Sequence, residues 1–148
     1  HRMAQAVEIE THHKLIDEDI DDLTQPINAP YAADSGLPDS VEVFTINGPF
    51  FFGAAAKLGE VLEHIGQPPK VFILRMRHVP LMDATGVAAL LKVMDQSRSQ
   101  GTHIILCRVQ PQPRKILNAM CTKMACTPIE FVTTFEEARH RAIALISQ

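Results

Sequence analysis

The stretch of residues 71–101 constrains the fold more than any other part of the chain. Residues 71–76 form an almost continuous apolar run, which suits a strand buried on both faces, as in a parallel sheet. From residue 87 onward, apolar residues recur at the spacing of one helix face, namely Val87, Leu90, Leu91 and Met94. Gly101 is placed to end that helix. The sequence therefore predicts a buried strand followed by an amphipathic helix that packs on the sheet.

The loop between this strand and this helix carries Asp83, Ala84, Thr85 and Gly86. The Asp83 carboxylate is suited to cap the helix, because it can accept backbone N–H groups that would otherwise lack a partner. Thr85 would lie in the first turn, where exposed N–H groups and the helix dipole stabilise a phosphate, although a threonine there is more often structural. Gly86 either admits the backbone of a partner or allows tight packing of the helix, and the sequence leaves both interpretations open.

The rest of the chain divides into an N-terminal lead and one domain. Residues 1–40 combine an acidic run at 17–22 with several prolines, which predicts a short helix or extended lead followed by a loop. Residues 1–3 resemble the remnant of a tag, so we expect the natural protein to begin further upstream. The acidic run is either a solvated surface or a contact for a basic partner. The domain is expected to span residues 41–148.

Within residues 41–148, strands and helices are expected to alternate. Further strands are predicted at residues 41–47, 103–109 and 129–132, each followed by a helical pattern, and Thr134 is placed to cap the last helix. Short connections between alternating elements indicate a parallel sheet covered by helices. The expected fold class is α/β, with a mostly parallel sheet of four or five strands and four or five helices.

Composition excludes several classes of function. A chain of 148 residues with a net charge of −3 has room for one domain and no basic tract for nucleic acid. Three cysteines without CxxC spacing indicate a reducing compartment and no zinc site, and the one in an apolar run is expected to be buried. No apolar run approaches the roughly 20 residues of a membrane-spanning helix, so we expect the isolated chain to be soluble.

No motif for catalysis or for a cofactor is present. The chain lacks GxSxG, HExxH, GxGxxG and P-loop patterns, which argues against an enzyme and predicts no cofactor and no metal. Arg75, Arg77 and His78 follow one another near the end of the predicted strand. They could contribute to a weak anion, nucleotide or partner contact, or they could form an ordinary solvated strand end.

Two motifs resemble a known family. A buried strand, a loop ending in Leu-Met-Asp-Ala-Thr-Gly and a helix resemble the signature of the STAS domain. In the anti-sigma factor antagonists of that family the second residue after the Asp is a phosphorylated serine, and here it is Thr85. A second segment resembles the Gly-Pro-Leu-Phe-Phe stretch of STAS domains from SulP anion transporters. Its residues here are Gly48, Pro49, Phe50, Phe51 and Phe52. The antagonists usually have a more polar turn there, so the resemblance favours the transporter branch.

The resemblance implies a regulatory and interaction domain without catalytic activity. It would lie at the C-terminus of a SulP-family transporter of sulfate, bicarbonate or carboxylates, on the cytoplasmic side of the inner membrane, with the lead as the junction to the last membrane helix. Its implied partners are the membrane domain, a cytosolic regulatory protein and a second copy of the chain. The alternative is a stand-alone anti-sigma factor antagonist regulated by phosphorylation at Thr85. A small ligand-binding protein or enzyme would instead need a convergent polar pocket.

Overall fold

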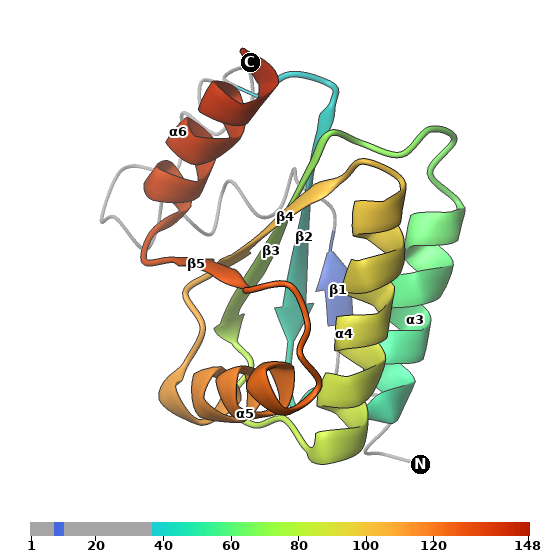
Figure 1. Ribbon diagram of the computed structural model, residues 1–148, viewed down its shortest axis with the longest axis vertical. Coiled ribbons are helices and arrows are strands. Elements are labelled where there is room, and N and C mark those ends of the chain that lie inside the picture. Colours follow the sequence, from blue (N-terminus) through green and yellow to red (C-terminus); the bar gives the residue numbers. More distant parts are fainter. Residues whose placement is uncertain (1–7, 11–36) are drawn as a thin grey trace.

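The computed structural model describes residues 8–10 and 37–148, and these form one five-stranded sheet with helices on both faces (Figure 1). The strands lie in the order β1 to β5 across the sheet. Strand β1 pairs antiparallel with β2, and all other neighbours are parallel. The strand bounds are β1 Glu8–Glu10, β2 Val41–Asn47, β3 Val71–His78, β4 His103–Cys107 and β5 Glu130–Val132. The expected α/β fold with a mostly parallel sheet is confirmed.

Four helices follow the four parallel strands. They are α3 Phe52–Glu63, α4 Ala84–Ser99, α5 Pro111–Lys123 and α6 Phe135–Ile146. Helices α3, α4 and α5 pack on one face of the sheet, whereas α6 covers the other (Figure 1). Right-handed crossovers between parallel neighbours place consecutive helices on the same face. Because the strands run in one direction, α3, α4 and α5 all begin at the carboxyl edge of the sheet, at the lower end of Figure 1.

The core is divided by the sheet into two apolar clusters. The larger cluster lies under α3, α4 and α5 and includes Phe44, Leu74 and Leu90. The smaller cluster lies under α6 and includes Val43 and Ile73. Neighbouring residues of β2 and β3 therefore face opposite clusters, and the continuous apolar run predicted to be buried on both faces is buried on both faces.

Two element boundaries differ from the prediction in ways that matter for the site. Strand β3 continues beyond residue 76 to His78, so Arg75 lies inside a strand and not at its end. Strand β1 lies in the predicted lead, where Ile9 pairs with Ile46 of β2. Three residues are too short a segment to show an alternating pattern, which is why the sequence did not indicate this strand. The acidic run at 17–22 and the tag-like residues 1–3 lie outside the described residues.

The cysteines also differ from the expectation. Cys121 in the last turns of α5 forms a disulfide with Cys126, with a distance of 5.1 Å between their Cα atoms. Ala125 has a φ of 53°, and this left-handed turn brings residue 126 back toward the helix. Because Cys121 and Cys126 do not have CxxC spacing, this pair was not predicted from the sequence. Cys107 is free and buried in β4, as the apolar run around it predicted.

The Glu130 carboxylate joins β5 to β4 and α6, and we expect its contribution to stability to depend on pH. Glu130 accepts hydrogen bonds from Arg141 and His103, both at 2.7 Å. Partial burial raises the pKa of this carboxyl, but the hydrogen bonds from Arg141 and His103 outweigh it and hold the pKa below its ordinary value. The ionised pair therefore stabilises the fold above the unfolded-state pKa of about 4.3 and loses that contribution as the pH falls toward the folded-state pKa.

We expect Glu130→Gln to lower the free energy of unfolding by less than about 1 kcal/mol at pH 7, because the pair is partly exposed. The difference from the wild type should shrink as the pH falls through about 4. Urea unfolding of both chains at several pH values measures it. Glu60→Gln is the control, since Glu60 is exposed and has no ion pair among the described residues. A difference that grows in acid would contradict the assignment.

Candidate functional site

The start of α4 lies in unusually close contact with the turn at residues 48–51, between β2 and α3, which we call the aromatic turn. A Cβ added at Gly86 would lie 2.6 Å from the backbone oxygen of Phe50 and 2.9 Å from the Cα of Phe51. No side chain fits at such distances, so residue 86 must be glycine for the two segments to meet as they do. Of the two interpretations that the sequence left open for Gly86, the structure supports tight packing within the chain.

Asp83 caps α4 as predicted. Its Oδ1 accepts a hydrogen bond of 2.7 Å from the backbone N–H of Gly86 and one of 3.0 Å from the Thr85 hydroxyl. Asp83, Ala84 and Thr85 are exposed, whereas Gly86 is buried. One carboxylate therefore satisfies the helix end and also orients the hydroxyl beside it. The first turn of α4 is presented to solvent on a rigid base.

Two glutamines hold the loop that leads into α4, and neither was predicted from the sequence. The side-chain amide of Gln112 accepts from the Met82 N–H at 2.9 Å and donates to the Met82 carbonyl at 3.0 Å. Gln110 donates to the Arg77 carbonyl at 2.7 Å. Because β4 ends opposite Arg75, residues 77–82 have no strand beside them on that side. The two glutamine side chains supply the backbone hydrogen bonds that such a strand would have made. Their positions around Pro111 carry no periodic signal, so only the tertiary structure reveals this role.

The aromatic turn places one ring inside and one outside. Gly48 has a φ of 93°, which glycine tolerates, and its N–H donates to the His78 carbonyl at 2.9 Å. Phe50 is fully buried, and its N–H donates to the Leu81 carbonyl at 2.9 Å.

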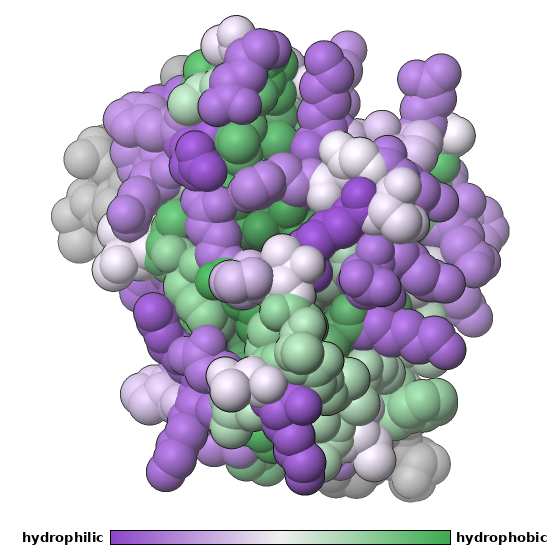
Figure 2. Space-filling view, in the orientation of Figure 1, coloured by the Kyte–Doolittle hydropathy of each residue, from purple (hydrophilic) through white to green (hydrophobic). Residues whose placement is uncertain are grey.

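Phe52 is 62% exposed, and Leu81 is 44% exposed. Figure 2 shows apolar surface over the lower end of the molecule, where α5 and the start of α4 lie. We call the exposed residues Phe52, Leu81, Ala84 and Thr85 the α4-start surface.

The three basic candidates do not form one cluster. Arg75 is fully buried, donates to the Thr45 hydroxyl at 2.8 Å and lies 5.8 Å from the centre of the Phe135 ring. The expectation that Arg75 takes part in a surface anion or partner contact is therefore wrong, because β3 extends past it. His78 is exposed at the strand end.

Arg77 lies in a shallow cavity of about 270 Å³ at the carboxyl edge of the sheet. Arg108, Val109, Gln110 and Thr133 form the rest of its lining. The φ of Arg108 is 59°, a turn conformation that places it beside Arg77 and that the apolar pattern of β4 did not indicate. The sequence therefore identified one of the two cationic residues here and missed the other.

No metal-binding group and no membrane span is found in the described part of the chain. Among residues 8–10 and 37–148, no three His, Cys, Asp or Glu side chains gather where they could hold a metal ion. None of the helices described is long and apolar enough to cross a bilayer.

The close approach at Gly86 predicts a large effect of a single methyl group. We expect Gly86→Ala to lower the free energy of unfolding by about 2 kcal/mol or more, because the Cβ would overlap backbone atoms that cannot rotate away. Urea unfolding measures this. Gly53→Ala in α3 is the matched control, because its Cβ would meet nothing within 4 Å, and it should stabilise the chain by about 0.5–1 kcal/mol. Equal effects of the two substitutions would show that α4 does not pack on the turn as described.

The Asp83 cap predicts a smaller loss. Asp83→Ala should lower the free energy of unfolding by about 1 kcal/mol, while Asp83→Asn, which keeps an acceptor oxygen, should lose much less. Hydrogen exchange should localise the change, with faster exchange at the Gly86 amide than in the last turn of α4. Unchanged exchange at Gly86 in Asp83→Ala would rule out the carboxylate as its partner.

Comparison with known proteins assigns the fold to a family. The family model of the STAS domain matches residues 36–138. The candidate sulfate transporter YvdB of Bacillus subtilis (strain 168) is 34% identical over 80 residues, which are 53% of this chain and 15% of that protein. This chain thus corresponds to a small part of that relative's length.

Two solved structures are similar over most of their length. A crystal structure of a sulfate transporter family protein from Wolinella succinogenes has 38% identity and a TM-score of 0.68, over 76% of this chain and 92% of that one. The STAS domain of a SulP transporter from Vibrio cholerae has 27% identity and a TM-score of 0.65, over 78% and 92%. The resemblance noted in the two motifs is therefore confirmed across the domain. The chain belongs to the STAS domain family and is homologous to the STAS domains of SulP-family transporters.

Proposed function

We propose that this chain is the cytoplasmic regulatory domain of a SulP-family anion transporter and that it acts by protein contact and not by catalysis. The observation that carries the proposal is the similarity to the SulP STAS domain of Vibrio cholerae and to the Wolinella succinogenes protein over 92% of each. One relative is described as a sulfate transporter and another as a member of the sulfate transporter family, so sulfate is the first anion to test, with bicarbonate and carboxylates next.

We further assign the α4-start surface as the contact with the membrane domain of the same transporter. Phe52 and Leu81 expose apolar area there, and such patches on a soluble surface mark interaction sites. Three contacts hold this surface in one conformation. They are the helix cap by Asp83, the hydrogen bonds of the Gln112 side chain with the Met82 backbone, and the close approach of Gly86 to the aromatic turn. A partner that binds a rigid surface loses less conformational entropy than one that must order a loop.

The stand-alone antagonist is the less favoured alternative. Its defining step would be phosphorylation of Thr85, whose hydroxyl is exposed but lies 3.0 Å from the Asp83 carboxylate. A phosphate on that oxygen would replace a hydrogen bond with repulsion between like charges, although the helix dipole would favour it. Phosphorylation at Thr85 stays a prediction, and intact-mass measurement of the protein from its native host would test it.

The gene is the most direct test of the transporter assignment. We expect the coding frame upstream of residue 3 to continue without a stop codon and to encode several apolar segments of about 20 residues. Sequencing that region decides the matter. A start codon next to Met3 with no membrane-spanning segment in the frame would overturn the proposal.

The contact surface has its own test in the whole transporter. Ala84→Arg places a long charged side chain on the α4-start surface, and we expect it to slow sulfate uptake into proteoliposomes about tenfold or more. Ala144→Arg is the matched control, since Ala144 is an exposed alanine of α6 on the opposite face of the sheet. Equal amounts of folded transporter should be confirmed by size-exclusion chromatography. If both variants transport like the wild type, the assigned surface is wrong although the transporter assignment survives.

A further inference from the structure

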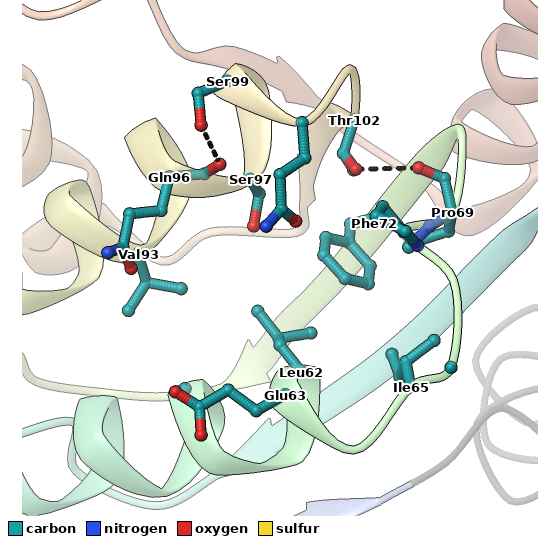
Figure 3. Close-up of a pocket in the computed structure, with 14 residues that line it drawn as sticks. Leu62, Glu63, Ile65, Pro69, Phe72, Val93, Gln96, Ser97, Ser99 and Thr102 are labelled. Carbon is teal, nitrogen blue, oxygen red and sulfur yellow. Dashed lines mark hydrogen bonds between the residues drawn. The ribbon is translucent and has the colours of Figure 1, made fainter.

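A cavity of about 520 Å³ opens between the last turns of α3 and α4 (Figure 3). It lies at the amino edge of the sheet, at the opposite end of α4 from the α4-start surface, and its volume is in the range of small-molecule sites. Apolar side chains of four elements or loops line part of it: Leu62, Ile65, Phe72 and Val93. The cavity can therefore cover a short apolar group.

A hydroxyl in the last turn of α4 belongs to the lining of this cavity. The Ser97 residue is only 7% exposed, and Figure 3 shows its hydroxyl pointing toward the space between the two helices. Its side chain makes no hydrogen bond with another residue of the described segments. The backbone carbonyl of Ser97 is already used, by the N–H groups of Gln100 at 3.1 Å and Thr102 at 3.0 Å. Among the described residues the Ser97 hydroxyl is not one of the buried polar atoms without a partner, so solvent reaches it through the cavity. A ligand that donates a hydrogen bond to this oxygen would take the place of that solvent.

The electrostatics of the cavity favour a cation. The last turns of α3 and α4 both reach it, and each helix C-terminus carries a partial negative charge. Glu63, the last residue of α3, adds a carboxylate at the opening, while Gln96 and Gln100 add amide oxygens. None of the 14 residues that line the cavity is Lys, Arg or His. An anion would meet no opposite charge there.

The kind of cation follows from the rest of the lining. Ca²⁺ and Mg²⁺ require several oxygen ligands, usually with more than one carboxylate, and Glu63 is the one acidic residue in the lining. We propose that the cavity binds a small organic ammonium ion with a short aliphatic stem. The ammonium group lies between the Ser97 hydroxyl, the helix ends and Glu63, and the stem packs on Phe72, Leu62 and Val93. This inference is independent of the proposed transporter function.

The test is a titration of the ¹⁵N-labelled chain with n-butylammonium chloride, followed by NMR. We expect saturable shifts of the Gly59 and Ser97 backbone amides and of the Gln96 and Gln100 side-chain amides. Sodium butyrate and n-butanol carry the same stem with the opposite charge and with none, and both should bind at least tenfold more weakly. Equal binding of butanol would remove the assigned role of charge, and shifts spread over the whole surface would overturn the site.

Two variants and a matched control sharpen the result. Glu63→Gln should weaken butylammonium binding about three- to fivefold, whereas Glu60→Gln, one turn earlier in α3 and outside the lining, should leave it unchanged. Gly59→Met should reduce binding at least tenfold by filling the cavity. Its Cβ would lie 3.8 Å from Val93, an ordinary contact, and methionine favours helix over glycine. Full binding by a folded Gly59→Met chain would overturn the proposal.

Discussion

The arrangement of the candidate site depends on one contact, the close approach of Gly86 to the backbone of Phe50 and Phe51. Backbone atoms cannot move aside as a flexible side chain can, so this contact determines where α4 begins relative to α3. The hydrogen bond from the Phe50 N–H to the Leu81 carbonyl joins the same two segments, and the two hydrogen bonds between Gln112 and Met82 attach the loop before α4 to α5. The exposed residues of the α4-start surface therefore rest on a base held by backbone contacts.

The direction of the strands explains why the two ends of the domain have different chemistry. Parallel strands joined by helices place the starts of α3 and α4 at the carboxyl edge and their ends at the amino edge, whereas α5 runs across the carboxyl edge (Figure 1). The α4-start surface accordingly has the positive ends of α3 and α4 beside it, with Asp83 satisfying one of them. Near the cavity, the ends of the same two helices contribute partial negative charge. The topology thus places the two proposed sites, the contact surface and the cation-binding cavity, at opposite edges of the sheet.

The sequence predicted those features that depend on local patterns. The bounds of β2, the caps at Asp83 and Thr134 and the two-sided burial of residues 71–76 all follow from residue spacing and capping chemistry. What it missed depends on contacts distant in the chain. The burial of Arg75 requires Thr45 and Phe135, which come from two other elements. The backbone of Met82 is hydrogen-bonded by Gln112, which lies 30 residues away in the chain. The motif residues were recognised, whereas the residues that hold them in place were not.

Helix α4 is the element that both ends share. It is roughly 24 Å long at 1.5 Å per residue, with Thr85 in its first turn and Ser97 in its last. The middle of α4 packs into the core through the buried residues Leu90, Leu91 and Met94, so the helix behaves as one rigid body. Any displacement at the cavity would have to be taken up at the Gly86 contact, where less than one methyl group of space is available. The lack of space at Gly86 and the packed middle of the helix therefore fix the position of α4 against α3, and the two edges keep a constant separation.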